Sequence, residues 1–419
     1  MTSSNVHPPL FPDKNNRVSL RRLIVKNYKS VGYADIQLRD LTILVGRNGA
    51  GKSNFLDALR FVVDGLQMSL DHAIQSRGGI DEVRRRSTGH PRNVVIRLEW
   101  QLPDFRKAAY EFEIAARKQG AFAVKREQLE ITNAAREVIA HYTVEEGTVS
   151  EGSAALPPGS PDRLYLVTAA SLPEFQETYE AMRSMGFYNL NPEAMKELQS
   201  PDAGEILHRD GANIASVVAR LGRDSPEIID RINQYLERIV PDVHRFDRVG
   251  LGPKETLQFR QAVKGAKNPW KFYAANMSDG TLRALGALTA VMQLAKRKRP
   301  VSLVGIEEPE TALHPAAAGA LMDALREASA RTQIIITSHS PDLIDQMKVG
   351  DEALLVVESR LGTTHISPPD KASTEAIKTH LYTPGELLRM DQLEVDTDAH
   401  SAKDEQLDLP HDNARDDKS

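Results

Sequence analysis

The 419-residue chain contains no cysteine, which excludes disulfide bonds, thiolate zinc sites and thiol catalysis. Aromatic residues make up only 5% of it. No apolar run approaches the roughly 18 residues of a membrane span, and residues 1–9 lack the apolar stretch of a signal peptide. There is also no sustained heptad pattern of the kind that forms a long coiled coil. These absences predict a soluble, cytoplasmic protein with no membrane partner.

Acidic charge is concentrated in one segment. The net charge is −5, yet residues 391–419 alone hold ten acidic and three basic residues. The rest of the chain is therefore slightly basic, and the overall acidity is no argument against a body that contacts nucleic acid. We expect a disordered tail over 1–17, one folded unit over 18–390 and an acidic disordered tail over 391–419.

Residues 46–53 read Gly-Arg-Asn-Gly-Ala-Gly-Lys-Ser, which fits the phosphate-loop pattern GxxxxGK[ST]. A short apolar run over 41–45 precedes it and helical spacing over 54–66 follows, which is the strand–loop–helix context that the motif needs. Backbone N–H groups of such a loop hold phosphates at a helix N-terminus. Lys52 is then expected to reach the β- and γ-phosphates of ATP and Ser53 to coordinate Mg²⁺. The expected nucleotide contacts are Gly46, Arg47, Asn48, Gly49, Ala50, Gly51, Lys52, Ser53 and Asn54.

A second apolar run, over 301–306, ends in Glu307-Glu308-Pro309-Glu310. A buried strand of this kind brings two carboxylates beside the phosphates. We expect Glu307 to hold Mg²⁺ and Glu308 to orient or deprotonate the attacking water. Aspartate is commoner at the first position, and the additional methylene of Glu307 would move the metal contact outward. The alternative is a solvated acidic turn.

Two further motifs follow the same logic. Met277-Ser278-Asp279-Gly280-Thr281, here called the signature motif, opens a helical pattern over 280–299. The hydroxyl of Ser278 and the N–H groups near Gly280 would favour an anion, although an ordinary helix N-cap explains them equally well in isolation. A strand-like run over 334–337 leads into Ser338-His339-Ser340-Pro341. A single histidine such as His339 is more often structural than catalytic.

Taken together, these motifs resemble those of the bacterial SMC/RecF-like ABC-type ATPases, in particular the AAA-family ATPases with a Ser-Asp-Gly-Thr signature that are related to OLD-type heads. Residues 23–30 and Leu313-His314-Pro315 are similar as well. The resemblance implies that His339 senses the γ-phosphate and that Ser278 and Gly280 contact ATP bound to a second chain. It also places Lys29 and Ser30 near the base and ribose. His314 is assigned either to the dimer interface or to a helix cap.

The resemblance implies an α/β fold of the P-loop NTPase class, an ABC/SMC-type head with ATP and Mg²⁺ as cofactors. One phosphate loop and one signature per chain imply a homodimer that forms on ATP binding. Within 18–390 we expect an antiparallel β lobe over about 93–170, a helical insertion over about 171–241, and a lobe with the remaining motifs over about 270–390. Residues 163–168 are assigned to a strand and 145–162 to a loop. Gln101 is a candidate for the glutamine that follows a lobe strand in this family.

Three functions remain open at this point. The first is an ATPase cycle that clamps DNA or gates a partner protein, as in DNA repair or anti-phage defence. The second is an ATP-sensing scaffold that controls a separate, nuclease-like effector, and the third is a transporter ATPase with a separate membrane subunit. Arg84, Arg85 and Arg86, with Arg77 and Arg92, form either a contact to a phosphate backbone or a solvated loop. The basic run 296–299 better fits a helix C-terminus.

Overall fold

The computed structural model describes residues 17–396 apart from 87–92, 154–155, 294–300, 349 and 351. The expected tail over 1–17, except for Arg17, therefore lies outside the described residues. The same holds for the acidic segment from residue 397 onward, for Arg92 and for the basic run 296–299.

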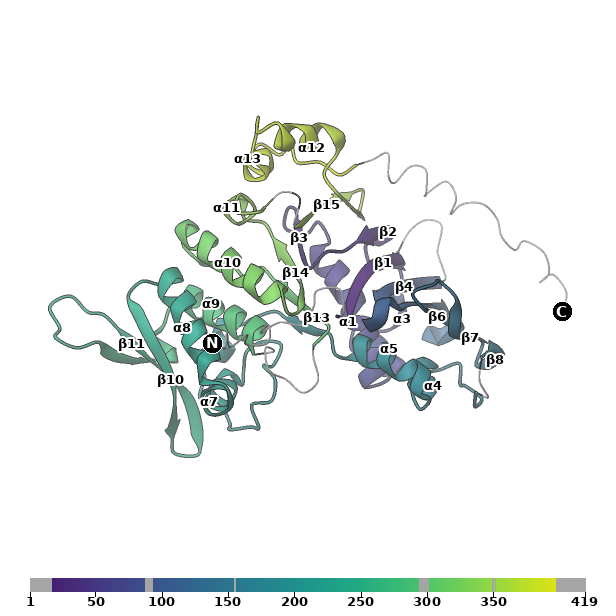
Figure 1. The fold of residues 1–419 in the computed structure, drawn as a ribbon, viewed down its shortest axis with the longest axis horizontal. Helices are drawn as coiled ribbons and strands as arrows, with labels where there is room; N and C mark the ends of the chain where they lie inside the picture. Colours follow the sequence, from purple (N-terminus) through teal and green to yellow (C-terminus); the bar gives the residue numbers. More distant parts are fainter. Residues whose placement is uncertain are drawn as a thin grey trace, which may run out of the picture.

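Thirteen strands of the described residues form one mixed sheet, in the order β8-β7-β6-β5-β4-β1-β2-β16-β15-β3-β14-β13-β9 (Figure 1). The half that carries the nucleotide motifs is parallel. Parallel strands covered on both faces are apolar throughout, and every residue of β3 and β14 is buried accordingly. The strands of this half are β3 (Leu41–Val45), β9 (Gly186–Tyr188), β13 (Leu303–Glu307), β14 (Gln333–Ser338) and β15 (Ala353–Arg360).

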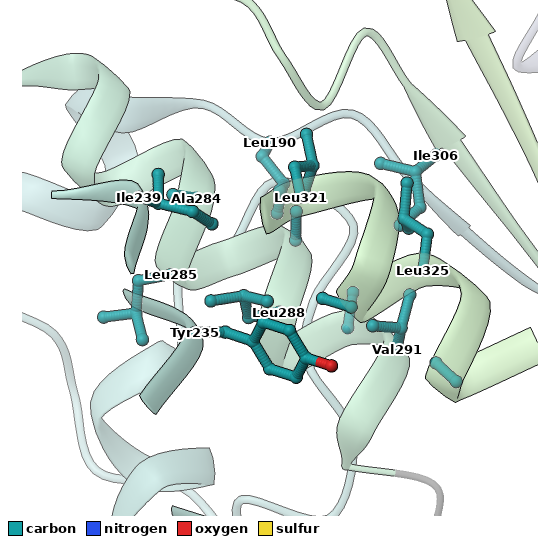
Figure 2. Packing of buried hydrophobic residues seen from close by; sticks show 14 of the residues in the cluster. Leu190, Tyr235, Ile239, Ala284, Leu285, Leu288, Val291, Ile306, Leu321 and Leu325 are labelled. Carbon is teal, nitrogen blue, oxygen red and sulfur yellow. The ribbon is translucent and has the colours of Figure 1, made fainter. Parts of the chain in front are cut away.

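Alternate residues of these strands belong to two separate cores. Ile43 and Ile336 belong to the core of helices α8 (Pro226–Ile239), α9 (Asp279–Met292) and α10 (Ala318–Ser329), where Figure 2 shows Leu288, Leu321 and Leu325 close together. Leu44 and Ile335 point to the other face and belong to the core of the first helix, α1 (Lys52–Gln67). The sheet is therefore held between two helical layers, and the carboxyl ends of β3, β13 and β14 form one edge.

The other half of the sheet is antiparallel except where β16 meets β2. It continues directly from the parallel half, so the expected β lobe is part of the same sheet. Its strands alternate buried and accessible residues, as in β4, which is the pattern of a sheet with one covered face. They are β1 (Ser19–Tyr28), β2 (Val31–Gln37), β4 (Asn93–Gln101), β5 (Lys107–Ala116), β6 (Phe122–Thr132), β7 (Val138–Glu145), β8 (Thr148–Gly152) and β16 (Thr363–Ser367).

Helices cover both faces of the sheet, and two more, α12 and α13, follow its last strand along the chain. The segment expected as a helical insertion also supplies β9, which pairs with β13 at the sheet edge, and α5, which packs on α1. The helices are α1 (Lys52–Gln67), α2 (Leu70–Gln75), α3 (Ile80–Val83), α4 (Leu166–Ala169), α5 (Pro173–Arg183), α6 (Pro192–Lys196), α7 (Ile214–Asp224), α8 (Pro226–Ile239), α9 (Asp279–Met292), α10 (Ala318–Ser329), α11 (Pro341–Ile344), α12 (Lys371–Lys378) and α13 (Pro384–Arg389).

A separate three-stranded antiparallel sheet extends from the helical side of the molecule (Figure 1). It consists of β10 (Val243–Leu251), β11 (Lys254–Gln261) and β12 (Trp270–Tyr273). Phe246, Phe259 and Phe272 lie side by side in the strand register and attach this sheet to the core that contains α8 and α9.

Three expectations about local structure are wrong. Residues 163–168 are not a strand, because α4 begins at Leu166 and the backbone N–H groups of Tyr165 and Leu166 donate to the buried carboxylate of Glu127. The loop expected over 145–162 contains β8, which forms a hairpin with β7. The acidic segment does not leave the fold at 391, because Val395 is buried and bridges Pro369.

Candidate nucleotide-binding site

The phosphate loop connects β3 to α1, as the sequence predicts, and two of its glycines are required by close contacts. A Cβ on Gly46 would lie 2.1 Å from the carbonyl oxygen of Val357. Gly51 has a φ of +105°, and a Cβ there would lie 2.0 Å from Oγ1 of Thr364. Only glycine combines this backbone conformation with so close an approach. The loop is thus pressed against β15 and β16, with its N–H groups at the start of α1.

Lys52 lies inside the loop that it belongs to. Its ammonium donates to the carbonyl oxygens of Gly46, at 2.7 Å, and Arg47, at 3.1 Å, and its side chain is only 5% exposed. Burial lowers the pKa of Lys52, although the nearby carboxylates of Glu308 and Glu310 oppose the shift. The positive charge is held where the loop would receive phosphates.

Ser53 and Glu307 meet beside the loop. The Ser53 hydroxyl donates to Oε2 of Glu307 at 2.7 Å, and Arg209 donates to the other carboxylate oxygen at 3.2 Å. A hydroxyl and a carboxylate oxygen this close are the hard oxygen donors that Mg²⁺ prefers. No group of three or more acidic or histidine side chains suited to a metal occurs in the described part of the chain. The residues present therefore fit an ion that is shared with nucleotide phosphates and water.

Glu308 stands between Lys52 and His339. Its Oε1 lies 3.3 Å from Nδ1 of His339 and 3.9 Å from the Lys52 ammonium. Its φ of +45° is in the left-handed region that non-glycine residues rarely adopt, and its N–H donates to the carbonyl of Thr337 at 3.0 Å. Such strain is held by the surrounding structure and often occurs at functional sites. The sequence-predicted catalytic residues are thus brought together.

The turn that carries Glu308 is fixed by Glu310. This side chain is buried, and Ser338 donates to its Oε1 at 2.6 Å. Burial raises the pKa of Glu310, and the bond from Ser338 opposes that shift. The contact joins the turn after β13 to the end of β14, next to His339. Sequence reasoning assigned no role to Glu310, although its place in the Glu-Glu-Pro-Glu motif was a signal.

Lys29 and Ser30, at the turn between β1 and β2, lie against α1. Asn54 donates to the Ser30 hydroxyl at 2.6 Å, and that hydroxyl lies 2.7 Å from Thr364 Oγ1, which donates to the carbonyl of Ala50. This chain of bonds ties the turn to the phosphate loop. Lys29 and Ser53 also line a cavity of about 440 Å³. Its lining is largely polar and includes Asn54, Asp57, Arg60, Arg77, Asn189, Arg209 and Glu307.

Asp57 on α1 is the centre of an ion-pair cluster that the sequence did not reveal. Lys29 lies 2.6 Å from its carboxylate, and Arg77 donates to both of its oxygens. Burial acts to raise the pKa of Asp57, but the hydrogen bonds from Arg77 and Lys29 outweigh it and lower the pKa to about 2. Arg77 is only 5% exposed, which argues against the phosphate-backbone contact weighed for it.

The rest of that cluster is paired within the chain. Arg84 and Arg86 form ion pairs with Asp81 and Glu82, and Arg85 donates to Thr363 at 2.6 Å. These contacts favour the solvated loop, the alternative weighed for this segment.

The signature motif begins α9. Ser278 is exposed and accepts from the N–H of Thr281 at 3.2 Å. A Cβ on Gly280 would lie 2.2 Å from the carbonyl of Ala312, so the motif packs on the turn that follows Glu308. Within the part of the chain that the structure describes, no hydrogen bond or ion pair joins Ser278 to the phosphate loop. The Ser278 hydroxyl is thus bonded within its own motif, to Thr281.

Two further sequence candidates have hydrogen-bond partners within the chain. Gln101 ends β4, beside Ser19 and thus at the opposite end of β1 from Lys29. Its amide donates to the carbonyls of Leu102 and Arg106, so this candidate glutamine lies away from the turn that carries Lys29. His314 accepts from the N–H of Ala316 at 3.2 Å, which is the capping role weighed as its alternative.

Comparison with protein-family models gives two matches. Residues 19–132 match the model described as "AAA ATPase domain", and residues 180–345 match the one described as "AAA domain, putative AbiEii toxin, Type IV TA system". The first spans the phosphate loop, and the second spans the signature motif, Glu308 and His339. No curated protein sequence matches the chain.

Comparison with solved structures finds SMC head domains, one of which shares the fold. The SMC head bound to the C-terminal winged-helix domain of ScpA is 14% identical, with a TM-score of 0.53 over 86% of this chain and 100% of that one. The SMC head of Thermotoga maritima is also 14% identical (TM-score 0.43; 84% and 98% covered). That of Pyrococcus furiosus, with an extended coiled coil and the ScpA C-terminal domain, is 13% identical (0.49; 87% and 99%). Only the first of these similarities supports the fold.

The expected α/β fold of the P-loop NTPase class is thereby confirmed. Among the described residues, no helix combines the length and the apolar character that a membrane crossing requires. The two ATPase domain matches, together with the arrangement of Lys52, Glu308 and His339, make this chain an ATPase with the fold of an SMC head.

Proposed function

We propose that two copies of the chain enclose ATP between the phosphate loop of one and the signature motif of the other, and that this cycle of closure and hydrolysis acts on DNA. The observation that carries the proposal is the position of Ser278. It lies exposed at the N-terminus of a 14-residue helix, an arrangement that favours anions, yet it is not bonded to its own loop.

Within each site the residues have distinct roles. Lys52 places a positive charge inside the loop and neutralises phosphate charge as it moves in the transition state. Glu308 accepts a proton from, or orients, the attacking water. His339, 3.3 Å from Glu308, holds that carboxylate and would sense a change at the phosphates through it.

Ser53 and Glu307 would hold Mg²⁺. The ion, when bound, neutralises charge on the β- and γ-phosphate oxygens. Glu307 reaches Ser53 at 2.7 Å despite its additional methylene, which supports this assignment.

A basic face supports DNA as the partner. Arg245, Arg260 and Lys271 lie directly opposite one another across β10, β11 and β12, and all three are exposed. Asp247 pairs with both arginines. Three like charges in one cross-strand row repel one another; Asp247 offsets part of this repulsion, and a phosphate backbone would offset the rest. Tyr273, 40% exposed, lies on the same face.

The alternative is an ATP-sensing scaffold that controls a separate effector, such as a nuclease, with little turnover of its own. The solved SMC head was bound to a domain of another protein, and one matching family model is described by a toxin–antitoxin system. Both are compatible with a head that gates a partner. In the scaffold function, the purified chain would bind ATP and would not gain DNA affinity from it.

A mixing experiment tests whether the sites are shared. Lys52→Ala removes function from one half of a site and Ser278→Arg from the other, so each variant alone should be inactive. In a mixed dimer one site carries both defects and the other carries neither. Random pairing of equal amounts makes about half of the dimers mixed, and half of the sites in these dimers are intact. The mixture should therefore recover roughly a quarter of the wild-type ATPase rate. If the mixture stays as inactive as its components, the sites are not composite.

DNA binding is tested separately. Replacing Arg245, Arg260 and Lys271 by serine should weaken binding to a duplex oligonucleotide. The number of ions released on binding, measured from the salt dependence of the affinity, should fall by up to about three. The matched control is the triple replacement of three exposed cations in the large sheet, far from β10–β12 in the strand order: Arg117 and Lys118 between β5 and β6, and Lys125 in β6. Equal weakening by both sets would remove β10–β12 as the DNA-contacting face.

A further inference from the structure

Arg209 occupies a tightly built loop before α7. The N–H of His208 donates to the side chain of Asn213 at 2.8 Å, and the N–H of Ala212 donates to Asp210 at 3.0 Å. Gly211, with a φ of +83°, closes the turn. Asn213 is buried. Because the loop is fixed by its own hydrogen bonds, the direction in which Arg209 leaves it is set by the fold.

Arg209 is paired with Glu307, the carboxylate that fits the metal. It lies 3.2 Å from Oε1 of Glu307, while Ser53 holds Oε2 at 2.7 Å. A divalent ion that binds Glu307 meets a guanidinium already paired with the same group. Arg209 also lines both the 440 Å³ cavity that contains Ser53 and a second cavity, of about 520 Å³, that contains Arg283 of α9. The side chain therefore has space on the side away from Glu307.

The backbone of this loop is tied to the segment between β9 and α6. The N–H of Asn189 donates to the carbonyl of Arg209, and the N–H of Asn191 donates to that of Asp210, both at 2.9 Å. Tyr188 lies level with Ile306 in the register of β9 and β13. Asn189 and Glu307 are each the next residue after this pair, so the loop is attached beside the metal carboxylate.

The same segment reaches the signature motif. The ammonium of Lys196, at the end of α6, lies 2.7 Å from the carboxylate of Asp279, the residue after Ser278. Leu190 packs against α9 at Gly286, where a Cβ would lie 2.9 Å from it. A continuous set of contacts therefore runs from Glu307 through Arg209 and residues 189–196 to the start of α9.

We propose that Arg209 is a positioning residue that competes with the metal for Glu307 and transmits its own release, through residues 189–196, to the signature motif. One chain's occupied site would thereby set the position of the signature that it offers to its partner. The second step rests on the proposed ATP-enclosing dimer, whereas the first does not, because the competition takes place within one chain.

The first step is tested by metal-dependent binding of a fluorescent ATP analogue, with Ser278→Arg in every protein so that dimers do not form. Arg209→Ala should lower the Mg²⁺ concentration for half-maximal binding by about two- to five-fold, the range for losing a partly exposed ion pair. Arg209→Lys should lie between it and the wild type. Arg220→Ala on α7, which removes ion pairs to Glu205 in the preceding loop and to Asp224 on the same helix, should leave the value unchanged. An unchanged or raised Mg²⁺ requirement for Arg209→Ala overturns the proposal.

The second step is tested in a Glu308→Gln background by titrating ATP-dependent dimerisation. Lys196→Ala should leave the Mg²⁺ requirement for binding unchanged and raise the ATP concentration needed for dimerisation. If the background dimerises and Lys196→Ala dimerises equally well, transmission to the signature is refuted. If the background itself does not dimerise, the proposed dimer fails, and the competition at Glu307 is still decided by the first experiment.

Discussion

Gly51 provides a direct test of how closely the phosphate loop packs on the sheet. In the Gly51→Ala variant the new Cβ would lie 2.0 Å from Oγ1, 2.7 Å from Cγ2 and 2.9 Å from Cβ of Thr364. Thr364 cannot move aside cheaply, because it is buried and holds both Ser30 and the carbonyl of Ala50. The backbone at φ +105° is also unfavourable for alanine.

Gly49 is a matched control for the magnitude. Its φ is +79°, but no atom lies within 4 Å of a Cβ placed there. Gly49→Ala should therefore cost only the left-handed conformation, about 1–2 kcal/mol. Gly51→Ala should cost the same plus about 1–3 kcal/mol for the overlap. Urea unfolding followed by circular dichroism measures the destabilisation of both variants. Equal destabilisation of the two variants would refute the close packing.

The remaining predictions concern charge. Burial raises the pKa of Glu127 from 4.5 to about 7, against hydrogen bonds from the Tyr165 N–H and the Tyr142 hydroxyl that lower it. The folded protein thus binds this proton more tightly than the unfolded chain. Stability should fall by about 3 kcal/mol as pH rises from about 4.5 to about 7, and in urea unfolding Glu127→Gln should lack that part of the slope. A variant with the wild-type slope would exclude Glu127 as its source. Lys52→Ala should abolish binding of an ATP analogue, whereas Glu308→Gln should bind it and lose at least about 100-fold in phosphate release; loss of binding in Glu308→Gln would contradict its catalytic role.

Local sequence patterns predict the parts of the fold next to the motifs. The apolar runs at 41–45 and 334–337 become β3 and β14 because strands buried on both faces need continuous apolar residues. Residues 163–168 have no such distinguishing pattern, since a short apolar run fits a strand or a helix. The contact that decides it, from Leu166 to Glu127, spans 39 positions.

The residues of the site also divide into those that the motifs predict and those that only the fold reveals. Lys52, Ser53, Glu307, Glu308 and His339 follow strands whose carboxyl ends share one sheet edge, so their convergence follows from the motifs. Arg209 lies 98 positions from Glu307 in a loop without a recognised motif, and only the tertiary fold brings them together. Gln101 was misplaced because β4 runs antiparallel to β1, which carries the end of β4 away from the nucleotide.

The central claim is that ATP joins two copies of the chain through the signature motif. It is tested most directly by light scattering of Glu308→Gln, with and without Mg-ATP, beside the same protein carrying Ser278→Arg. The account predicts a monomer that becomes a dimer only with ATP, and no dimer when Ser278 is replaced. A Glu308→Gln protein that binds ATP and keeps the same mass would contradict it, as would dimers that form equally well with Ser278→Arg.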